Sequence, residues 1–119
     1  MMEKISDMPK LQNLLSQQKV SLLYISMPNC SVCTAVKPRL EKLAVEKTIP
    51  LYQMDAAETP LVASVFQVLT APAVLLFSYG KEQQRQARFI DFNKLSQLID
   101  ALQKADATLD YEDLFNSHS

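Results

Sequence analysis

The 119-residue chain has very little glycine: Gly80 is the only one, and tryptophan is absent. Average usage of about 7% would give roughly eight glycines in a chain of this length. Dinucleotide-binding fingerprints, phosphate-binding loops and EF-hand calcium loops all require glycines at fixed positions. The sequence therefore excludes these three kinds of binding site.

An excess of charge of one sign is also absent, because 12 Lys and Arg stand against 13 Asp and Glu, for a net charge of -1. Nucleic-acid-binding domains carry a basic excess or a basic run, so we expect no nucleic-acid partner. No apolar run approaches the roughly 18 residues of a membrane span, and residues 1–10 lack the apolar core of a signal peptide. We therefore expect a cytoplasmic protein with no membrane partner.

The length and the hydrophobic content of 48% suit one folded domain rather than two domains or a disordered chain. We expect this single domain to span residues 1–105. Residues 106–119 contain four acidic residues and no lysine or arginine, so we interpret them as an acidic C-terminal tail. We expect the protein to be a monomer.

Strand-like and helical hydrophobic patterns alternate along the chain. Apolar or alternating runs predict strands at residues 3–6, 20–26, 50–55, 73–79 and 84–90. Apolar residues at helical spacing predict helices at residues 7–18, 32–44, 59–66 and 92–102. Gly80 begins the turn between the last two strands, where a hairpin needs a positive φ.

The order of these elements indicates the fold class. Strands that alternate with helices imply right-handed crossovers and a parallel sheet. The closing hairpin adds antiparallel strands at one edge. We therefore predict an α/β fold with a mixed central β-sheet, a parallel core plus an antiparallel edge hairpin, flanked by helices on both faces.

The only two cysteines, Cys30 and Cys33, lie where a buried strand meets an amphipathic helix. Cytoplasmic thiol systems keep most cysteine pairs reduced, so a structural disulfide is not the expected role. The unpaired N–H groups and the dipole at a helix N-terminus stabilise an anion. A cysteine there is more often a thiolate, the form that attacks disulfides. We interpret Cys30, nearer the loop, as the nucleophile and Cys33 as the resolving thiol.

Two other interpretations of the cysteine pair stay open: a role in handling metal ions, and an inert place in the core. Zinc binding needs four ligands, but the only histidine is His118 and no second cysteine pair exists, so we expect no bound metal. A metal-transfer role would use Met27 as a further soft ligand. The cysteines would be inert core thiols if the motif were buried, although Pro28 and Asn29 before it are typical of an exposed loop.

Four features, in order and at fitting distances, resemble the thioredoxin family. The strand LLYIS leads into CSVC, and Pro38 lies five residues after Cys33, where thioredoxins carry a helix-kinking proline. Asp55 follows the strand YQM. The segment TAPAVLLFSYGKE is similar to the one that holds the family's cis-proline, and Pro72 is the matching residue. The resemblance covers about residues 8–104.

The resemblance implies a thioredoxin-like protein-disulfide oxidoreductase with Cys30 and Cys33 as catalytic residues. It also implies a cis bond before Pro72, next to the cysteines, and a substrate-binding surface of Asn29, Ala71 and Pro72. There the Ala71 backbone would pair with an extended substrate. The implied redox group is the Cys30–Cys33 disulfide itself, with no other cofactor bound. The implied partners are a protein or small-molecule disulfide and, as electron donor, a reductase or low-molecular-weight thiol, in cytoplasmic redox homeostasis.

The sequence departs from the family at the positions nearest the cysteines. Asn29 replaces the typical tryptophan, and Ser31 and Val32 replace glycine and proline. Tyr24 stands where thioredoxins bury an aspartate, and Leu51 stands where they place its partner lysine. We interpret Tyr24 as a core or groove residue rather than a catalytic one. These departures favour, as an alternative function, a redox-sensing or protein-binding module with weak general reductase activity.

Overall fold

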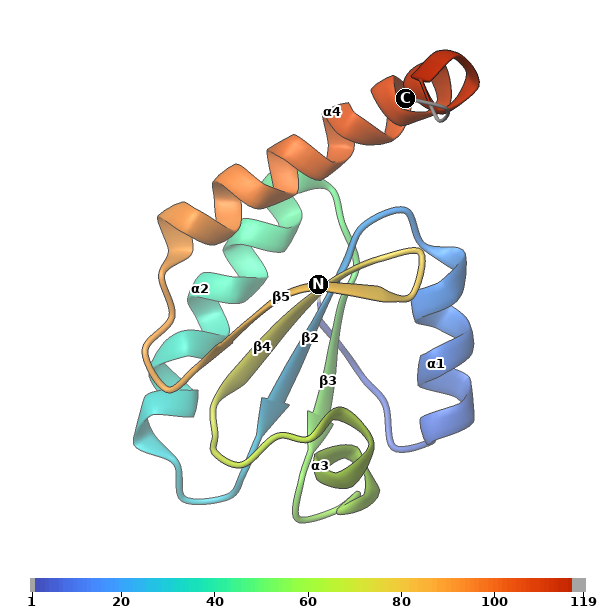
Figure 1. Cartoon of the computed structure of the whole chain (residues 1–119). Coiled ribbons are helices and arrows are strands. Elements are labelled where there is room, and N and C mark those ends of the chain that lie inside the picture. Colours follow the sequence, from blue (N-terminus) through green and yellow to red (C-terminus); the bar gives the residue numbers. More distant parts are fainter. Residues whose placement is uncertain (1, 117–119) are drawn as a thin grey trace.

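The computed structural model describes the backbone of residues 2–116 and the side chains of residues 3–104. Its strands are β1 (Met2–Lys4), β2 (Ser21–Ser26), β3 (Leu51–Asp55), β4 (Ala73–Ser78) and β5 (Lys81–Ala87). Its helices are α1 (Met8–Gln17), α2 (Ser31–Lys47), α3 (Leu61–Phe66) and α4 (Phe92–Asn116). Figure 1 shows the helices arranged around one central sheet.

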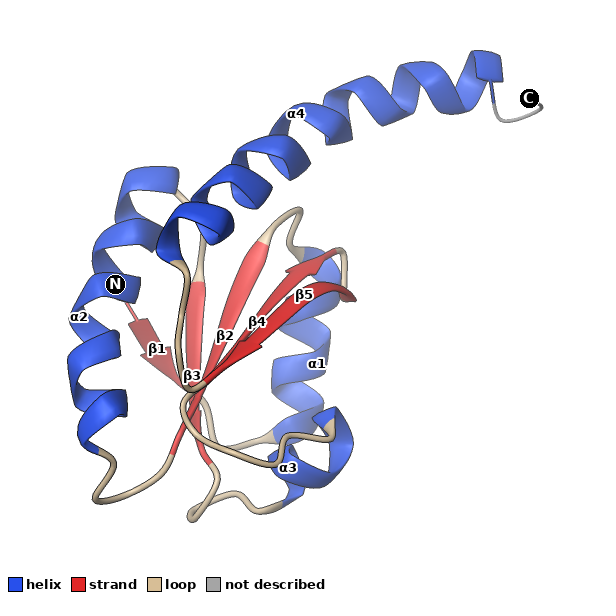
Figure 2. Cartoon of the chain, turned by 60° about the vertical axis from the view of Figure 1, so that its left-hand side comes forward, coloured by secondary structure: helices blue, strands red, loops and turns tan. Residues whose placement is uncertain are grey.

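The strands form one mixed sheet in the order β1-β3-β2-β4-β5. Strands β1, β3 and β2 run parallel, whereas β4 and β5 add antiparallel pairings at the other edge. Figure 2 shows α2 and α4 on one face of this sheet, and α1 and α3 on the other. The predicted α/β class, with a parallel core, an antiparallel edge hairpin and helices on both faces, is therefore confirmed.

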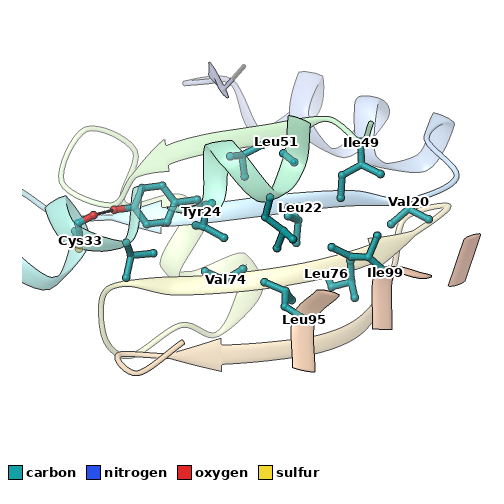
Figure 3. Packing of buried hydrophobic residues seen from close by; sticks show 14 residues of the cluster. Val20, Leu22, Tyr24, Cys33, Ile49, Leu51, Val74, Leu76, Leu95 and Ile99 are labelled. Atoms are coloured by element: carbon teal, nitrogen blue, oxygen red, sulfur yellow. Dashed lines mark hydrogen bonds between the residues drawn. The ribbon is translucent and has the colours of Figure 1, made fainter. Parts of the chain in front are cut away.

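Strand β2 is the centre of the core because alternate side chains of a strand point to opposite faces. Its residues Leu22 and Tyr24 join a buried cluster beneath α2 and α4, part of which is drawn in Figure 3. Its residues Leu23 and Ile25 join a second buried cluster beneath α1 and α3. The first cluster holds α2 on the sheet and so fixes where that helix begins.

Strand β5 differs from the predicted strand at 84–90. It begins at Lys81 because the turn is shorter than expected: Tyr79 and Gly80 both have positive φ, 50° and 82°, which places Ser78 opposite Lys81. Positive φ at both central residues is the geometry of a two-residue hairpin turn. The strand ends at Ala87 because the next residue has a φ of 67°.

Helix α4 is longer than the predicted helix at 92–102, since it continues to Asn116. Much of the predicted acidic tail at 106–119 is therefore helical, and residues 117–119 lie outside the described part of the chain. Figure 2 shows the last turns of α4 extending beyond the sheet. Within the described residues, no helix has the length and hydropathy needed to cross a membrane.

Candidate active site

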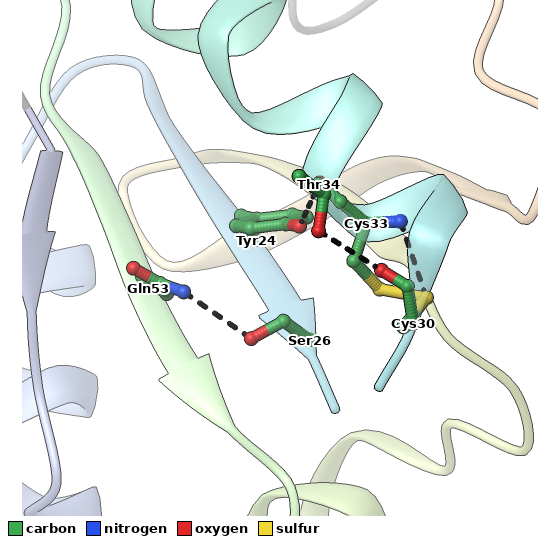
Figure 4. The surroundings of a disulfide bond; sticks show 6 residues. All are labelled: Tyr24, Ser26, Cys30, Cys33, Thr34 and Gln53. Atoms are coloured by element: carbon green, nitrogen blue, oxygen red, sulfur yellow. Dashed lines mark hydrogen bonds between the residues drawn. A yellow bond between two sulfur atoms is a disulfide. The ribbon is translucent and has the colours of Figure 1, made fainter. Parts of the chain in front are cut away.

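The cysteine pair lies at the start of α2, and the two residues form a disulfide. Cys30 is the N-cap residue and Cys33 lies in the first turn, with 5.2 Å between their Cα atoms. The backbone N–H of Cys33 donates a hydrogen bond of 3.1 Å to Cys30 Sγ (Figure 4). The sulfur of Cys30 therefore does the work of a capping group for a helix end that would otherwise leave N–H groups unpaired.

The two sulfur-bearing side chains differ in accessibility. Cys33 is only 4% exposed and belongs to the buried cluster under α2, whereas Cys30 is partly buried and packs against that cluster. The preceding residue, Asn29, is exposed and has a φ of 58°, which turns the chain into the helix. An external molecule therefore reaches Cys30 more easily than Cys33.

Tyr24 lies beneath the first turn of α2 and is 1% exposed. Its hydroxyl donates a 2.7 Å hydrogen bond to the carbonyl oxygen of Cys33 (Figure 4). Burial raises the pKa of Tyr24 to about 12, so the phenol stays neutral at physiological pH. Leu51, which lies opposite Leu22 on β3, is 1% exposed in the same cluster. These two positions thus provide a neutral hydroxyl and an apolar side chain, and no buried carboxylate–lysine pair.

The peptide bond between Ala71 and Pro72 is cis. Pro72 is buried and Ala71 is half-buried. Ala71 and Cys30 both pack against the same buried cluster, and Ala73 lies opposite Ile25, so the start of β4 lies beside the end of β2 that leads to the cysteines. Asn29 lies next to Cys30 on the exposed loop. The structure therefore brings the predicted substrate-binding residues to the same end of the sheet as the cysteines.

An open cleft of about 690 Å³ borders the disulfide on the side of β3. Sequence reasoning missed the residues that line it from the sheet, above all Ser26 and Gln53. The Gln53 Nε2 amide donates a 3.2 Å hydrogen bond to Ser26 Oγ (Figure 4). The signal in the sequence was Ser26, a polar residue two positions after Tyr24 at the end of an apolar run. The full lining is Tyr24, Ser26, Met27, Pro28, Asn29, Cys30, Ser31, Cys33, Thr34, Lys37, Gln53 and Asp55.

The described residues contain no set of metal ligands. Among them, no three His, Cys, Asp or Glu side chains lie close enough together to hold one metal ion. Met27, the further soft ligand considered for metal transfer, is 46% exposed on the loop before the cysteines. His118 lies outside the described residues.

This fold, with a cysteine pair at the start of α2, is that of a thiol–disulfide oxidoreductase. The Thioredoxin family model matches residues 4–104, and the chain belongs to the thioredoxin family. It is 38% identical over 100 residues to the thioredoxin-like protein YdfQ of Bacillus subtilis. The matched residues make up 82% of this chain and 88% of the relative. It is 31% identical over 84 residues to a thioredoxin of Mycobacterium tuberculosis, covering 69% of this chain and 72% of that protein.

Solved structures agree on the fold. A mutant thioredoxin from Halobacterium salinarum superimposes with a TM-score of 0.78 over 85% of this chain and 89% of its own. An oxidised mitochondrial thioredoxin from Saccharomyces cerevisiae gives a TM-score of 0.73, over 84% of this chain and 94% of its own. Their sequence identities to this chain are 23% and 20%, so these two structures support the fold alone.

Proposed function

We propose that the protein exchanges electrons with substrate disulfides through Cys30, and that Cys33 resolves the mixed disulfide. The observation that carries this assignment is the asymmetry of the pair. Cys30 is the more accessible sulfur and already accepts the Cys33 N–H at 3.1 Å, whereas Cys33 is buried behind it. The same N–H and the positive end of α2 would stabilise a thiolate at Cys30 Sγ after reduction.

The reaction takes place in two exchanges. First, the Cys30 thiolate attacks one sulfur of the substrate disulfide, so a Cys30–substrate bond forms and the other substrate sulfur leaves as a thiolate. Second, Cys33 gives up its proton to that thiolate or to water, and its sulfur attacks Cys30 Sγ. The second substrate thiolate leaves, and the Cys30–Cys33 bond forms. The dithiol has then given two electrons to the substrate.

Two parts of the site support substrate contact beside the sulfurs. We assign the Ala71 backbone, next to the cis bond, to pairing with an extended substrate segment. We assign exposed Asn29 to contact with the substrate on the loop side, and buried Pro72 to shaping this end of the core. The electron donor in this scheme is a reductase or a low-molecular-weight thiol. A cytoplasmic role in redox homeostasis belongs to the same proposal, because a dithiol reductant needs a reducing compartment.

Insulin reduction by dithiothreitol tests this function. We expect the wild-type protein to accelerate precipitation of the insulin chains, and Cys30→Ser to reduce the rate to that of dithiothreitol alone. Cys33→Ser should also lose turnover. After reduction and removal of dithiothreitol, it should retain a mixed disulfide with insulin, because no resolving thiol is then present. Circular dichroism of each variant checks that it is folded. Equal rates for wild type and Cys30→Ser would overturn the proposal.

The second candidate function is a redox-sensing or binding module. It is favoured by the neutral Tyr24 phenol beneath Cys33, which leaves the resolving thiol without a buried carboxylate to accept its proton. This alternative predicts slow insulin reduction by the wild-type protein together with a long-lived complex on Cys33→Ser. Rapid wild-type turnover would remove it.

A further inference from the structure

The cleft beside the disulfide has a polar floor because of how β2 and β3 pair. In their parallel register Leu22 lies opposite Leu51, Tyr24 opposite Gln53, and Ser26 opposite Asp55. Alternate residues share a face, so all six side chains lie on the α2 face of the sheet. That face changes from apolar to polar toward the carboxyl ends of the strands. The carboxyl ends of strands are where open α/β sheets bind ligands.

The floor retains hydrogen-bonding capacity toward the cleft. Ser26 is 7% exposed and lines the cleft. Its hydroxyl accepts the Gln53 amide, which leaves the hydroxyl proton and the Gln53 Oε1 oxygen without a partner among the described side chains. A ligand in the cleft would therefore meet both a donor and an acceptor.

Charges of opposite sign face the cleft from its two walls. Lys37 comes from α2, and within residues 3–104 no carboxylate pairs with it. Asp55 comes from the end of β3, and its Oδ1 accepts the N–H groups of Ala57 and Glu58. The other Asp55 oxygen has no partner in that same range. The helix wall thus offers a cation and the sheet wall offers an anion.

We infer that this cleft binds small thiols and disulfides that carry both an ammonium and a carboxylate, of the amino-acid type. Lys37 binds the carboxylate and Asp55 binds the ammonium, while Ser26 and Gln53 hydrogen-bond the rest of the molecule. A volume of about 690 Å³ lies within the range of small-molecule sites. Both Cys30 and Cys33 border the cleft, so a sulfur held there lies beside the reacting pair.

The inference rests on the proposed function and names a substrate for it. With the protein as dithiol, the Cys30 thiolate attacks one sulfur of the bound disulfide and releases one small thiolate. Cys33 then attacks Cys30 Sγ, releases the second small thiolate and closes the Cys30–Cys33 bond. Two electrons pass to the small molecule, and the two cysteine protons end on its thiols. The reverse sequence lets an excess of the small thiol reduce the protein.

The test compares four disulfides of different charge. Reduced protein is mixed with excess cystine, cystamine, dithiodipropionate or hydroxyethyl disulfide, quenched with acid, alkylated and analysed by intact mass. Each oxidation rate is divided by the rate of free dithiothreitol with the same disulfide, which removes intrinsic reactivity. We expect the normalised rate for cystine to exceed those for the three others by about threefold or more, the effect of partly exposed ion pairs.

Two charge variants locate the binding groups. Lys37→Gln should lower the cystine rate relative to cystamine, which lacks the carboxylate, by about threefold. Asp55→Asn should lower the cystine rate relative to dithiodipropionate, which lacks the ammonium, by a similar factor. Asparagine keeps a side-chain oxygen for the Ala57 N–H, so the turn is retained. Lys42→Gln on the same helix and Glu58→Gln after the same strand remove exposed charges that do not line the cleft, and should leave both ratios unchanged.

Equal normalised rates for the four disulfides would overturn the inference and leave the proposed function intact. Ratios that do not respond to Lys37→Gln and Asp55→Asn would also overturn it. Failure of the proposed function looks different: none of the four disulfides would oxidise the reduced protein, or all would oxidise Cys30→Ser and wild type alike.

Discussion

At the residue scale, Tyr24 contacts the cysteine motif directly, through its hydrogen bond to the Cys33 carbonyl. A buried carboxylate at this position would accept a proton from the resolving thiol. A phenol whose pKa is about 12 instead stays protonated and donates its hydrogen to the Cys33 carbonyl. Tyr24 is therefore a positioning residue that holds the first turn of α2, and in the proposed reaction the proton of Cys33 leaves to the solvent or to the substrate.

The hydrogen bond of Tyr24 predicts a measurable loss of stability. Tyr24→Phe removes the 2.7 Å bond to Cys33 in a buried environment, and should lower the free energy of unfolding of the oxidised protein by about 1 kcal/mol. Urea unfolding measures this loss. The matched control is Tyr52→Phe, because Tyr52 is 4% exposed but its hydroxyl bonds no other residue in the described part of the chain. A control loss as large as that of Tyr24→Phe would contradict the assignment.

The raised pKa of Tyr24 also predicts a dependence on alkaline pH. The ordinary tyrosine pKa of 10.0 applies to the unfolded chain, whereas burial raises it to about 12 in the folded protein. Stability from Tyr24 is therefore full below pH 10 and falls as the pH rises toward 12, since only the unfolded state releases the proton. The free energy of unfolding of wild type minus that of Tyr24→Phe should therefore fall by about 1 kcal/mol per pH unit over this range, so that it changes sign before pH 12.

Urea unfolding of both proteins at several alkaline pH values gives this slope. Burial and Glu3 also raise the pKa of Tyr52, but this group is present in both proteins and cancels in the difference. A difference that stays constant between pH 9 and 12 would show that Tyr24 titrates normally in the folded protein.

At the element scale, Arg85 ties the short helix α3 to the edge hairpin. Its guanidinium donates to the carbonyl oxygens of Phe66 and Gln67, at 2.8 and 3.1 Å, where α3 ends. It also pairs with Glu82 on its own strand at 2.6 Å. These bonds satisfy carbonyls that a helix end leaves unpaired, and they hold the segment that leads into Ala71 and Pro72.

This contact predicts that two substitutions by glutamine, at Arg85 and at Glu82, lower the free energy of unfolding by different amounts. Arg85→Gln should lower the free energy of unfolding by about 1 to 2 kcal/mol, because it removes the bonds to both carbonyls and to Glu82. Glu82→Gln should cost less than about 1 kcal/mol, since it breaks only a partly exposed ion pair. Urea unfolding gives both values. Equal losses would mean that the ion pair, and not the bonds to α3, carries the effect.

Most elements could be predicted from the sequence because their hydrophobic periods are local. The hydrophobic patterns of strand β2 and of the cysteine-bearing helix each lie within a short stretch of sequence. The junction of these two elements predicts the site at Cys30. The polar floor could not be predicted, because Ser26 and Gln53 meet only through the pairing of two separate strands. Arg85 was missed because its partners are backbone carbonyls, which leave no mark in the sequence.

At the scale of the whole molecule, α4 joins the body of the protein through its first half. Leu95 and Ile99 are 1% and 0% exposed in the cluster beneath α2 and α4. Asp100 pairs with Lys47 at 2.8 Å, and Gln103 donates to the Lys47 carbonyl at 2.9 Å. The later turns of α4 extend beyond the sheet in Figure 2.

This division predicts where the chain can be shortened. A protein ending at Lys104 keeps every core contact of α4 named above, and should retain its free energy of unfolding to within about 0.5 kcal/mol. Ile99→Ala, by contrast, should cost about 2 to 4 kcal/mol because it leaves a cavity in a closely packed core. Urea unfolding of both proteins measures the contrast. A truncated protein as unstable as Ile99→Ala would contradict the proposed domain limit at residue 105.

The most direct test of the account is the intact mass of each cysteine variant after reaction with a disulfide. Reduced Cys33→Ser, mixed with hydroxyethyl disulfide, should gain the mass of one half-disulfide on Cys30. Wild type should instead lose two hydrogens as the Cys30–Cys33 bond forms. Cys30→Ser should form an adduct far more slowly, because Cys33 is buried. Adduct formation as fast on Cys30→Ser as on Cys33→Ser, or a wild-type dithiol that no disulfide oxidises, would contradict the account.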